Sequence, residues 1–446
     1  MDTAKNKFNL TSITWPLFVQ SFLGLLMGNI NVFMLGHFSD KAVGAVGVTN
    51  QIIGMLSIIY GVISMGTAIL ITQNLGAKNL KLAKAIAQMS IFLNTFFGFI
   101  FSLILIIFGK TLLKIMNLPE EMLPYGSVYI IIVGGSSFLS SAIAIFSSIL
   151  RSYGHAKLPM KIAVLINLLN ITGNYISLFR PFGLPALGVE GVAISVVLSN
   201  TIGLAIIGFI TTKNLNLKLF TKDFFSMDLN IIKLIMKIGG PAAGEYISYS
   251  LSQIVVTYII TSLGTEAINT RIYLQNITSF VSMLSLSIGQ GSQILVGYMM
   301  GGGKLNKMHN ICIKSLKIAV FSNFALALIL YIFSPKLLGL FTSNPSIIHI
   351  GKTILLIDIF LEVGRAFNHV VGNSLRGIGD VRYPVIVSVS SMWLICVLLS
   401  LVFGINLKFG LVGMWIASGL DEWFRGVVLL KRWYSKPYMR IKLVSE

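Results

Sequence analysis

The sequence is poor in charged residues and in cysteine. Asp, Glu, Lys and Arg together make up only 11% of its 446 residues, whereas 55% are hydrophobic. A soluble core of this size could not hide so much apolar surface, so lipid is expected to be the main solvent. Its two cysteines, Cys312 and Cys396, lie within apolar runs and lack metal-ligand spacing. The cysteines therefore imply neither a disulfide framework nor a zinc site.

Signatures of enzymatic chemistry are missing too. The chain contains no phosphate-binding loop, no zinc-type spacing of His and Cys, and no nucleophile elbow. We therefore expect that the protein is not an enzyme and that it carries no cofactor. Any work that it does must draw on an ion gradient.

Apolar runs of about twenty residues recur along the chain, each long enough to cross a hydrocarbon layer of roughly 30 Å as a helix. The first run contains Trp15 and Pro16 and no small-residue cleavage pattern, so we expect it to be retained rather than removed as an export signal. The pattern predicts an all-α integral membrane protein with twelve transmembrane helices near residues 14–35, 45–75, 85–108, 127–150, 160–179, 187–212, 238–263, 273–300, 312–334, 350–374, 384–405 and 410–430.

The formal net charge of +19 is unevenly distributed along the chain. If the N-terminus is cytoplasmic, the connections on that side carry roughly three times as many Lys and Arg residues as those on the opposite side. This bias predicts a multi-pass protein of the cell inner membrane with both termini in the cytoplasm. The charge is thus explained by the lipid bilayer, with no nucleic-acid partner, and we expect the chain to act as a monomer.

An internal repeat divides the chain into two similar halves. Leucine matches mean little in so apolar a chain, so only glycine, proline and basic positions are weighed. At an offset of about 225 residues, Pro16 recurs as Pro241, Gly76 as Gly301, and the loop Arg151, Gly154, Lys157, Pro159 as Arg376, Gly379, Arg382, Pro384. Further on, Gly188 and Gly191 match Gly410 and Gly413 after a short gap.

Six crossings in each half return the second copy to the membrane in the same orientation as the first. The repeat therefore predicts two parallel, pseudo-symmetric six-helix bundles: an N-terminal lobe of residues 1–212, a cytoplasmic linker of residues 213–237 and a C-terminal lobe of residues 238–446. Transporters built of two such bundles commonly bind their substrate between the lobes and alternate its exposure. The alternative is an old duplication that is retained only for packing.

Several stretches spread over the chain resemble the multidrug and toxic compound extrusion (MATE) family. They are residues 33–37 (FMLGH), 42–47 (AVGAVG), 187–193 (LGVEGVA) and 375–380 (LRGIGD). The resemblance implies a secondary active efflux transporter that exchanges sodium ions or protons for amphipathic, often cationic, organic compounds. Composition alone does not indicate that activity.

The sequence departs from the family's pattern in the first half. Family members commonly carry an aspartate five residues before the glycine that is Gly36 here, and this chain has Asn31. Some members place a second aspartate where Asn174 aligns, beside an asparagine that matches Asn170. Both candidate acids of the first lobe are thus amides, and the coupling role that the resemblance would give them is in doubt.

The carboxylates that remain inside apolar runs lie in the second half. An ionisable group within a bilayer is costly and by default marks a functional site. Glu245 follows Pro241 by four residues, and a proline frees a backbone carbonyl that could serve as a ligand. Tyr249 and Ser252 continue the same helical face and are candidates to line the cavity. Snorkelling of Glu245 to the membrane surface is the alternative.

A second group of ionisable residues occupies one stripe of the tenth predicted helix. Asp358, Glu362, Arg365 and His369 are spaced at i, i+4, i+7 and i+11. An ion site and a self-satisfied Glu362–Arg365 pair are equally compatible with that spacing. We expect Glu245, Asp358 and Glu362 to couple transport to Na+ or H+, with Glu245 and Asp358 as candidate Na+ ligands, whereas Asp421 is expected to pair structurally with Arg425.

Polar side chains without charge supply the remaining candidates. Because it stands at the repeat position of Glu245, Gln20 joins the set that we expect to line the substrate cavity or join neighbouring helices. The full set is Asn31, Gln20, Asn170, Asn174, Tyr249, Ser252, Gln275, Asn276, Arg365 and His369.

Two other functions remain open. A flippase for a lipid-linked saccharide would need a basic cavity, whereas the charges inside the apolar runs lean acidic, with Arg365 and Arg425 the only basic residues assigned there. The second alternative is a channel-like or non-transporting relative, for which Asn31 in place of an aspartate is the best support.

Overall fold

The computed structural model describes residues 8–179, 187–217 and 228–440, and every regular element in them is helical. A helix satisfies its own backbone groups, which is what a lipid environment demands. The first six membrane segments are α2 (Leu10–Gly36), α3 (Asp40–Gly76), α4 (Leu80–Ile115), the run of α5 (Leu123–Tyr129), η1 (Ile130–Gly134) and α6 (Ser137–Ser152), α7 (Lys157–Phe179), and α8 (Gly188–Leu215).

Six further membrane segments follow in the second half, together with the short helices α13 (Ser334–Gly339) and η6 (Pro437–Met439). The six are α10 (Leu229–Thr261), α11 (Thr265–Gly301), α12 (Leu305–Ile332), the run of α14 (Pro345–Phe367), η3 (Asn368–Gly372) and α15 (Asn373–Gly377), the run of α16 (Arg382–Ser391), η4 (Met392–Val397), α17 (Leu398–Leu401) and η5 (Val402–Asn406), and α18 (Gly410–Tyr434). The predicted fold class, an all-α membrane protein of twelve helices in two six-helix bundles, is confirmed.

The segments differ in how strongly their composition favours a membrane. Among the described residues, eight helices are long and apolar enough to cross a bilayer, and a ninth if the α5–α6 pair counts as one span. The three remaining segments, α10, α14 and α18, all carry ionisable residues within the helix. The places where apolar character is interrupted are therefore the places where the candidate site residues lie.

Several segments contain a π-helical stretch, in which the ladder of backbone hydrogen bonds is locally widened. In the fourth segment η1 ends at Gly134, and the axis turns by 44° before α6. The tenth segment has η3 directly after α14, at Asn368 and His369. Such stretches often accompany functional sites, and this one interrupts the ionisable stripe.

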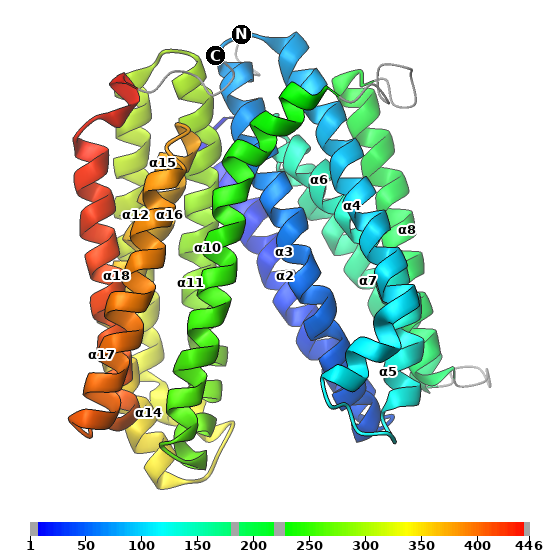
Figure 1. The fold of residues 1–446 in the computed structure, drawn as a ribbon, viewed down its shortest axis with the longest axis vertical. Helices are drawn as coiled ribbons and strands as arrows, with labels where there is room; N and C mark the ends of the chain where they lie inside the picture. Colours follow the sequence, from blue (N-terminus) through cyan, green and yellow to red (C-terminus); the bar gives the residue numbers. More distant parts are fainter. Residues whose placement is uncertain (1–7, 180–186, 218–227, 441–446) are drawn as a thin grey trace. The chain divides into compact units, whose positions relative to one another are not determined.

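Internal contacts divide the described chain into two compact units. The first comprises Val19–Ile71 and Asn79–Gly239, and the second comprises Phe8–Phe18, Thr72–Lys78 and everything described from Gly240 onward. The proposed 213–237 linker overlaps the end of α8 and the start of α10, and its residues 218–227 lie outside the described part. The start of α2 and the end of α3 thus belong to the second unit. Figure 1 draws the helices coloured in chain order.

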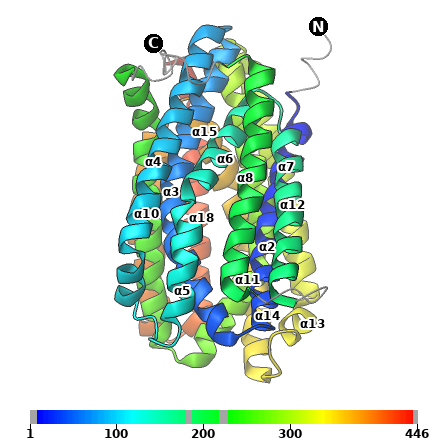
Figure 2. The same ribbon diagram turned by 90° about the vertical axis from the view of Figure 1, so that its right-hand side faces the viewer.

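Small residues bring the helices of the first unit together. At the contact of α4 with α6, Asn94 Nδ2 donates to the Ser141 carbonyl at 2.9 Å, and Ser141 Oγ donates to the Asn94 carbonyl at 2.6 Å. A Cβ on Gly98 would lie 2.5 Å from Ser141 Oγ. Glycine at that position permits the close approach on which both hydrogen bonds depend. Helices α7 and α8 pack side by side in the same unit (Figure 2).

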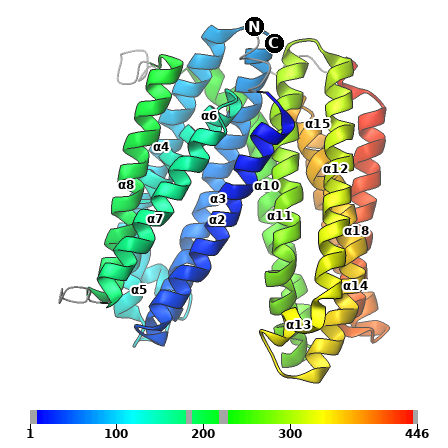
Figure 3. The same cartoon turned by 180° about the vertical axis from the view of Figure 1, so that it is seen from behind.

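Two clusters of buried residues form the core of the second unit. One lies among α11, α12, α14 and α18 around Trp433 and Val370, and the other includes Leu274, Ile354 and Met414. Figure 3 shows α11 and α12 running alongside one another, in agreement with their extensive contact. The acidic segments α14 and α18 also pack together, so their ionisable residues face a shared interior.

The repeat seen in the sequence has a structural counterpart in its turns. Gly154 and Gly379 both have positive φ values, 79° and 94°. The helices that follow begin at the matched positions Lys157 and Arg382. Gly188 and Gly410 also share positive φ, 55° and 58°, and each begins the last helix of its half.

The closest backbone approach occurs where the end of α3 meets the end of α11. A Cβ on Gly301 would lie 1.8 Å from the Gln73 carbonyl oxygen, and a Cβ on its repeat partner Gly76 would lie 2.0 Å from the Tyr298 carbonyl oxygen. Both obstacles are backbone atoms, which cannot rotate away. Only glycine fits at either position.

We expect Gly301→Ala and Gly76→Ala each to destabilise the protein by about 1–3 kcal/mol or more, because the helices must separate. The measurement is the melting temperature in detergent together with the yield of monodisperse protein. Gly54→Ala on α3 is the matched control, since a Cβ there meets nothing within 4 Å. Equal behaviour of Gly301→Ala and the control would contradict the expectation.

Candidate functional site

A cluster of ionised side chains joins α14 to α18 inside the second unit. Arg365 donates from Nη1 to Glu362 one turn earlier and from Nε to Glu422 Oε1 at 3.4 Å. Arg425 Nη2 forms ion pairs with Glu422 Oε1 at 3.2 Å and with Asp421 Oδ2 at 2.5 Å. The two arginines therefore link three carboxylates into one network.

Neutral donors complete this network. Asn323 on α12 donates from Nδ2 to both the carbonyl oxygen and the Oε2 atom of Glu362, at 2.9 and 3.2 Å. Ser391 donates to Asp421, and Asn368 in the π-helical stretch donates to the Glu422 side chain. Glu362 is completely buried, so these partners replace the water that its charge would otherwise need.

Asp358 lies on the same stripe, one turn before Glu362, but its surroundings differ. Its Oδ1 accepts a hydrogen bond from Trp415 Nε1 at 2.9 Å. Its Oδ2 is buried and has no hydrogen-bond partner, and the residue as a whole is 2% exposed. Within the described residues, Asp358 makes no salt bridge. It is the one acid on α14 or α18 without an arginine partner.

The charges on α14 and α18 do not balance. Four carboxylates (Asp358, Glu362, Asp421 and Glu422) share the interior with two guanidinium groups (Arg365 and Arg425). Fully ionised, the group carries an excess of two negative charges. Because buried charge is costly unless compensated, this excess must be met by bound cations or by protons.

His369 is on the predicted stripe but faces another neighbour. Its Nδ1 lies 2.9 Å from Ser285 Oγ on α11, and its backbone carbonyl accepts from Asn373 Nδ2 at 2.7 Å. Gly289 on α11 permits this approach, since a Cβ there would lie 2.3 Å from that carbonyl oxygen. The histidine is thus placed at the contact of η3 with α11 rather than beside Glu362.

Glu245 on α10 forms an ion pair with the residue that begins the repeat loop. Arg376 Nη2 donates to Glu245 Oε2 at 2.6 Å, and both side chains are about 15% exposed on average. This pair joins α10 to the end of the tenth segment. The two candidate Na+ ligands, Glu245 and Asp358, have no common partner among the described contacts.

The first unit holds the repeat counterpart of this pair. Arg151 Nη1 donates to Gln20 Oε1 at 3.0 Å. Gln20 and Arg151 occupy the repeat positions of Glu245 and Arg376, and each pair is separated by 131 residues. The same contact is therefore present in both bundles, with a carboxylate as acceptor in the second and a neutral amide in the first.

Three asparagines of the first half, which the family resemblance indicated, form one cluster. Asn174 Nδ2 donates to Asn31 Oδ1 at 2.8 Å and to Asn170 Oδ1 at 3.0 Å. Asn174 is 1% exposed, and its own Oδ1 is buried without a hydrogen-bond partner. Residues 143 positions apart in the chain are thus brought together, and the cluster carries no formal charge.

The remaining candidates do not join these clusters. Ser252 is buried, but its hydroxyl donates to the Tyr249 carbonyl of its own helix at 2.8 Å, while the Tyr249 ring is 48% exposed. Gln275 and Asn276 on α11 are both exposed. Their exposure places them on the surface of the second unit, away from the α14–α18 network.

The sequence patterns gave an incomplete set of basic residues within the membrane segments. The interpretation that Arg365 and Arg425 are the only basic residues in apolar segments is wrong, because Arg271 lies within α11 and is 8% exposed. Its Nη1 donates to Thr257 Oγ1 at 2.7 Å and its Nη2 to Gln253 Oε1 at 2.9 Å. Glu266 and Arg271 lower the hydropathy of the first turns of α11, so the helix begins earlier than hydropathy indicates.

Three further functional candidates were missed: Glu422, Asn323 and Trp415. None of the three carried a signal in the sequence, because each contacts a residue at least 39 positions away. Within the described part of the chain, no group of three or more His, Cys, Asp or Glu residues could hold a metal ion. A coupling ion would have to rely on fewer carboxylates together with neutral oxygens.

Comparison with known proteins agrees with this arrangement. A family model described as MatE matches residues 16–176 and 241–402, so it matches each half of the chain once. An uncharacterized transporter of Bacillus subtilis, YisQ, is 40% identical over 98% of this chain and 96% of its own. A protein of Thermotoga maritima named as a probable multidrug resistance protein, NorM, is 28% identical over 94% of this chain and 90% of its own.

A solved structure shares the fold. The crystal structure of a mutant of VcmN, a MATE transporter of Vibrio cholerae, superimposes with a TM-score of 0.89 over the full length of both chains, at 18% identity. At that identity the likeness supports the arrangement of the helices alone.

Proposed function

Because this chain belongs to the MatE family of transporters, we propose that it is a secondary active efflux transporter that exchanges Na+ or H+ for amphipathic, often cationic, organic compounds by alternating access. The observation that carries the proposal is the unpartnered Oδ2 atom of Asp358, a carboxylate oxygen enclosed in a membrane-embedded bundle. Such a group is stable only with a cation or a proton.

The charge imbalance on α14 and α18 supports the direction of coupling. An entering cation gains roughly 2.3 kcal/mol per charge for every 100 mV of membrane potential. Binding it near Asp358 would neutralise part of the excess negative charge, and releasing it would restore that excess. The second bundle is therefore the proposed coupling unit, whereas the Asn31–Asn170–Asn174 cluster offers no charge to titrate.

The cargo follows from the same charges. A cavity that borders acidic groups favours an organic cation over an anion. The relatives named as multidrug resistance proteins are consistent with such a cargo. We further propose that both termini and the 213–237 linker between the lobes are cytoplasmic, and that the transporter works as a monomer in the cell membrane.

Two alternatives remain as competing proposals. A lipid-linked saccharide flippase would be favoured by basic groups inside the helical bundles. Arg151, Arg271 and Arg376 lie on helices in addition to the two arginines assigned there from the sequence. Of these three, Arg376 is paired with Glu245. A channel-like relative would be favoured by the neutral first-bundle cluster. Gradient-dependent accumulation separates the antiporter from both.

The test is flux of a fluorescent amphipathic organic cation into everted membrane vesicles. We expect uptake when a sodium or a proton gradient is imposed, and its loss when that gradient is collapsed by the matching ionophore. Uptake of a lipid-linked saccharide that needs no gradient would favour the flippase. No accumulation under either gradient would overturn the proposal.

We expect Glu245→Gln to lower gradient-driven transport by about tenfold or more, because the amide cannot carry the charge that Arg376 and a cargo cation would share. Glu190→Gln is the matched control, since Glu190 is exposed at the start of α8. Transport and drug resistance in a sensitive host are measured at equal membrane levels of the variants. Unchanged transport would remove Glu245 from the mechanism.

A further inference from the structure

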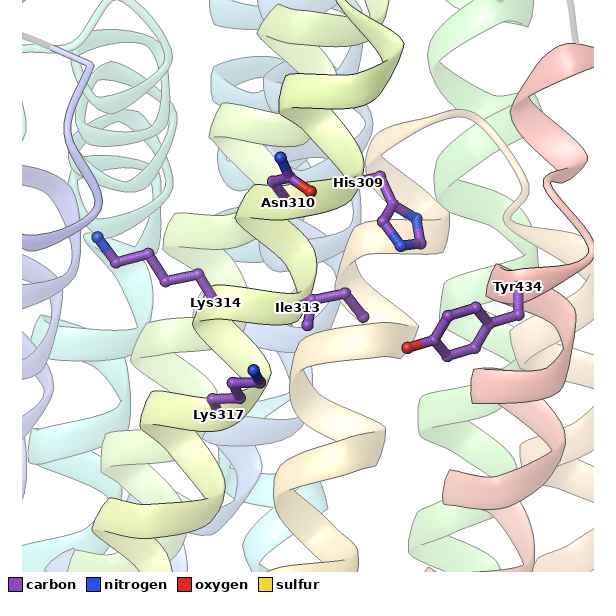
Figure 4. Close-up of a pocket in the computed structure, with 6 residues that line it drawn as sticks. All are labelled: His309, Asn310, Ile313, Lys314, Lys317 and Tyr434. Carbon is purple, nitrogen blue, oxygen red and sulfur yellow. The ribbon is translucent and has the colours of Figure 1, made fainter.

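A cavity of about 470 Å³ opens on the outer side of the second unit, between α12 and α18. It is lined by His309, Asn310, Ile313, Lys314, Lys317 and Tyr434. Figure 4 shows the first five along α12 and the Tyr434 hydroxyl pointing toward them from α18. The lining residues include two lysines and a histidine, and none of them belongs to the α14–α18 network.

Two lysines in this cavity lie near the start of a membrane segment. The apolar run predicted at residues 312–334 contains both, and Lys317 lies only about 8 Å along the helix axis beyond the first residue of that run. Both Lys314 and Lys317 are exposed, and neither takes part in a salt bridge within the described residues. Because the ammonium groups of lysines at the edge of the hydrocarbon layer reach the headgroup region, an anionic lipid headgroup is expected to supply their counter-charge.

His309 is held in a fixed orientation at the same cavity. Its ring stacks on Trp433, which is completely buried, with centroids 6.1 Å apart. Its Nδ1 lies 3.4 Å from the Tyr438 hydroxyl, and the Tyr434 ring packs edge-on against it at 5.6 Å. The Nε2 atom is left for a ligand, so the cavity has a preformed polar wall.

An apolar strip continues from the cavity along both helices. On α12, Phe321 is 73% exposed and lies four residues beyond Lys317, and Phe324 follows on the same face. On α18, Val427 is 56% exposed, two turns before Tyr434, and Leu420 lies two turns further. Basic and polar side chains next to exposed apolar side chains suit a phospholipid, which has a charged headgroup and apolar acyl chains.

We propose that this cavity binds an anionic phospholipid. Its phosphate would sit between the Lys317 ammonium and the Tyr434 hydroxyl, with Lys314 and His309 as further donors, and its acyl chains would lie along Phe321 and Val427. Basic pockets between membrane helices on the cytoplasmic side recognise such headgroups. The positive-inside bias assigns the α12 start, with Lys304 and Lys307, to that side. The site is independent of which ion or cargo the transporter uses.

The test is native mass spectrometry of the full-length protein released from vesicles of phosphatidylcholine and phosphatidylglycerol in equal amounts. The wild type should retain phosphatidylglycerol in preference to phosphatidylcholine, and the double variant Lys314→Gln/Lys317→Gln should weaken that preferential retention roughly thirtyfold. Lys304→Gln/Lys307→Gln is the matched control, with the same change of charge outside the cavity. Lys317→Arg should preserve retention, because the cation is kept.

A second measurement separates the lipid from other anions and from misfolding. Phosphatidylglycerol should raise the melting temperature of the wild type and of the control variant but not that of Lys314→Gln/Lys317→Gln, whose melting temperature in phosphatidylcholine should be unchanged. Equal retention by both double variants would overturn the proposal. So would an equal rise in melting temperature with inorganic phosphate alone, which would indicate an anion site without lipid recognition.

Discussion

Replacement of Arg365 by Met is expected to destabilise the protein by about 3–5 kcal/mol, the usual cost of leaving buried charges without their partner. Arg365 is the residue that contacts both Glu362 and Glu422, and Glu362 is completely buried. Without the guanidinium group, only Asn323 remains to stabilise the Glu362 carboxylate. The measurement is thermal unfolding of the purified protein in detergent, together with the amount that inserts into the membrane.

A double variant separates charge from packing. In Arg365→Met/Glu362→Gln the buried carboxylate and its partner are removed together, and Asn323 can still donate to the side chain at position 362. We therefore expect the double variant to be more stable than Arg365→Met alone, because removing an ion pair as a unit costs less than breaking it. If both variants unfold at the same temperature, the arginine acts by filling space and not by neutralising charge.

The helices and their order could be predicted from the sequence. Whether a segment forms a membrane helix depends on the hydropathy of its own residues, and where it ends depends on nearby glycine and proline. The run predicted at 160–179 corresponds to α7, and the run predicted at 410–430 corresponds to α18. The limits of helices that carry charge could not be predicted as well. Helix α11 begins at Thr265, eight residues before the predicted start, because Glu266 and Arg271 lower the hydropathy of its first turns.

Contacts within one helix were accessible to sequence analysis, and contacts between helices were not. The spacing of Glu362 and Arg365 indicated their ion pair, which the structure contains. Nothing in the sequence placed Glu422, 57 residues away, on the same guanidinium group. The helical stripe also grouped His369 with the acids, but the π-helical stretch that begins at Asn368 turns the histidine toward Ser285. Periodicity alone therefore overestimated the number of residues in the ionic cluster.

The two halves of the repeat differ in the charge of one acceptor side chain. Each half has an arginine at the start of the repeat loop and an acceptor on its first helix. The contact is therefore present twice, as Arg151–Gln20 and as Arg376–Glu245. The geometry of the contact needs an acceptor oxygen but not a negative charge. Packing therefore does not require the negative charge of Glu245, and its presence agrees with the proposed role of the second bundle in coupling.

Asp358→Asn is expected to abolish gradient-driven transport while leaving the melting temperature unchanged or higher. Asn can still accept from Trp415 at position 358, so the packing contact is kept. The change removes an enclosed negative charge whose Oδ2 has no partner, and an unsatisfied buried group costs about 1–3 kcal/mol, with more for a charged one. A group that lowers stability in the empty protein and is needed for transport is what an ion-coupling site requires.

Asp421→Asn is the matched control for that experiment, since it makes the same chemical change on the neighbouring helix. Asp421 is paired with Arg425 at 2.5 Å and bonded to Ser391, so its replacement is expected to lower the melting temperature. The two aspartates should therefore shift stability in opposite directions, and only Asp358→Asn should uncouple accumulation of the organic cation from the imposed sodium or proton gradient. Gradient-dependent transport by Asp358→Asn at the wild-type level would exclude this carboxylate as the coupling group, and the excess charge would then have to be assigned to Glu362 or Glu422.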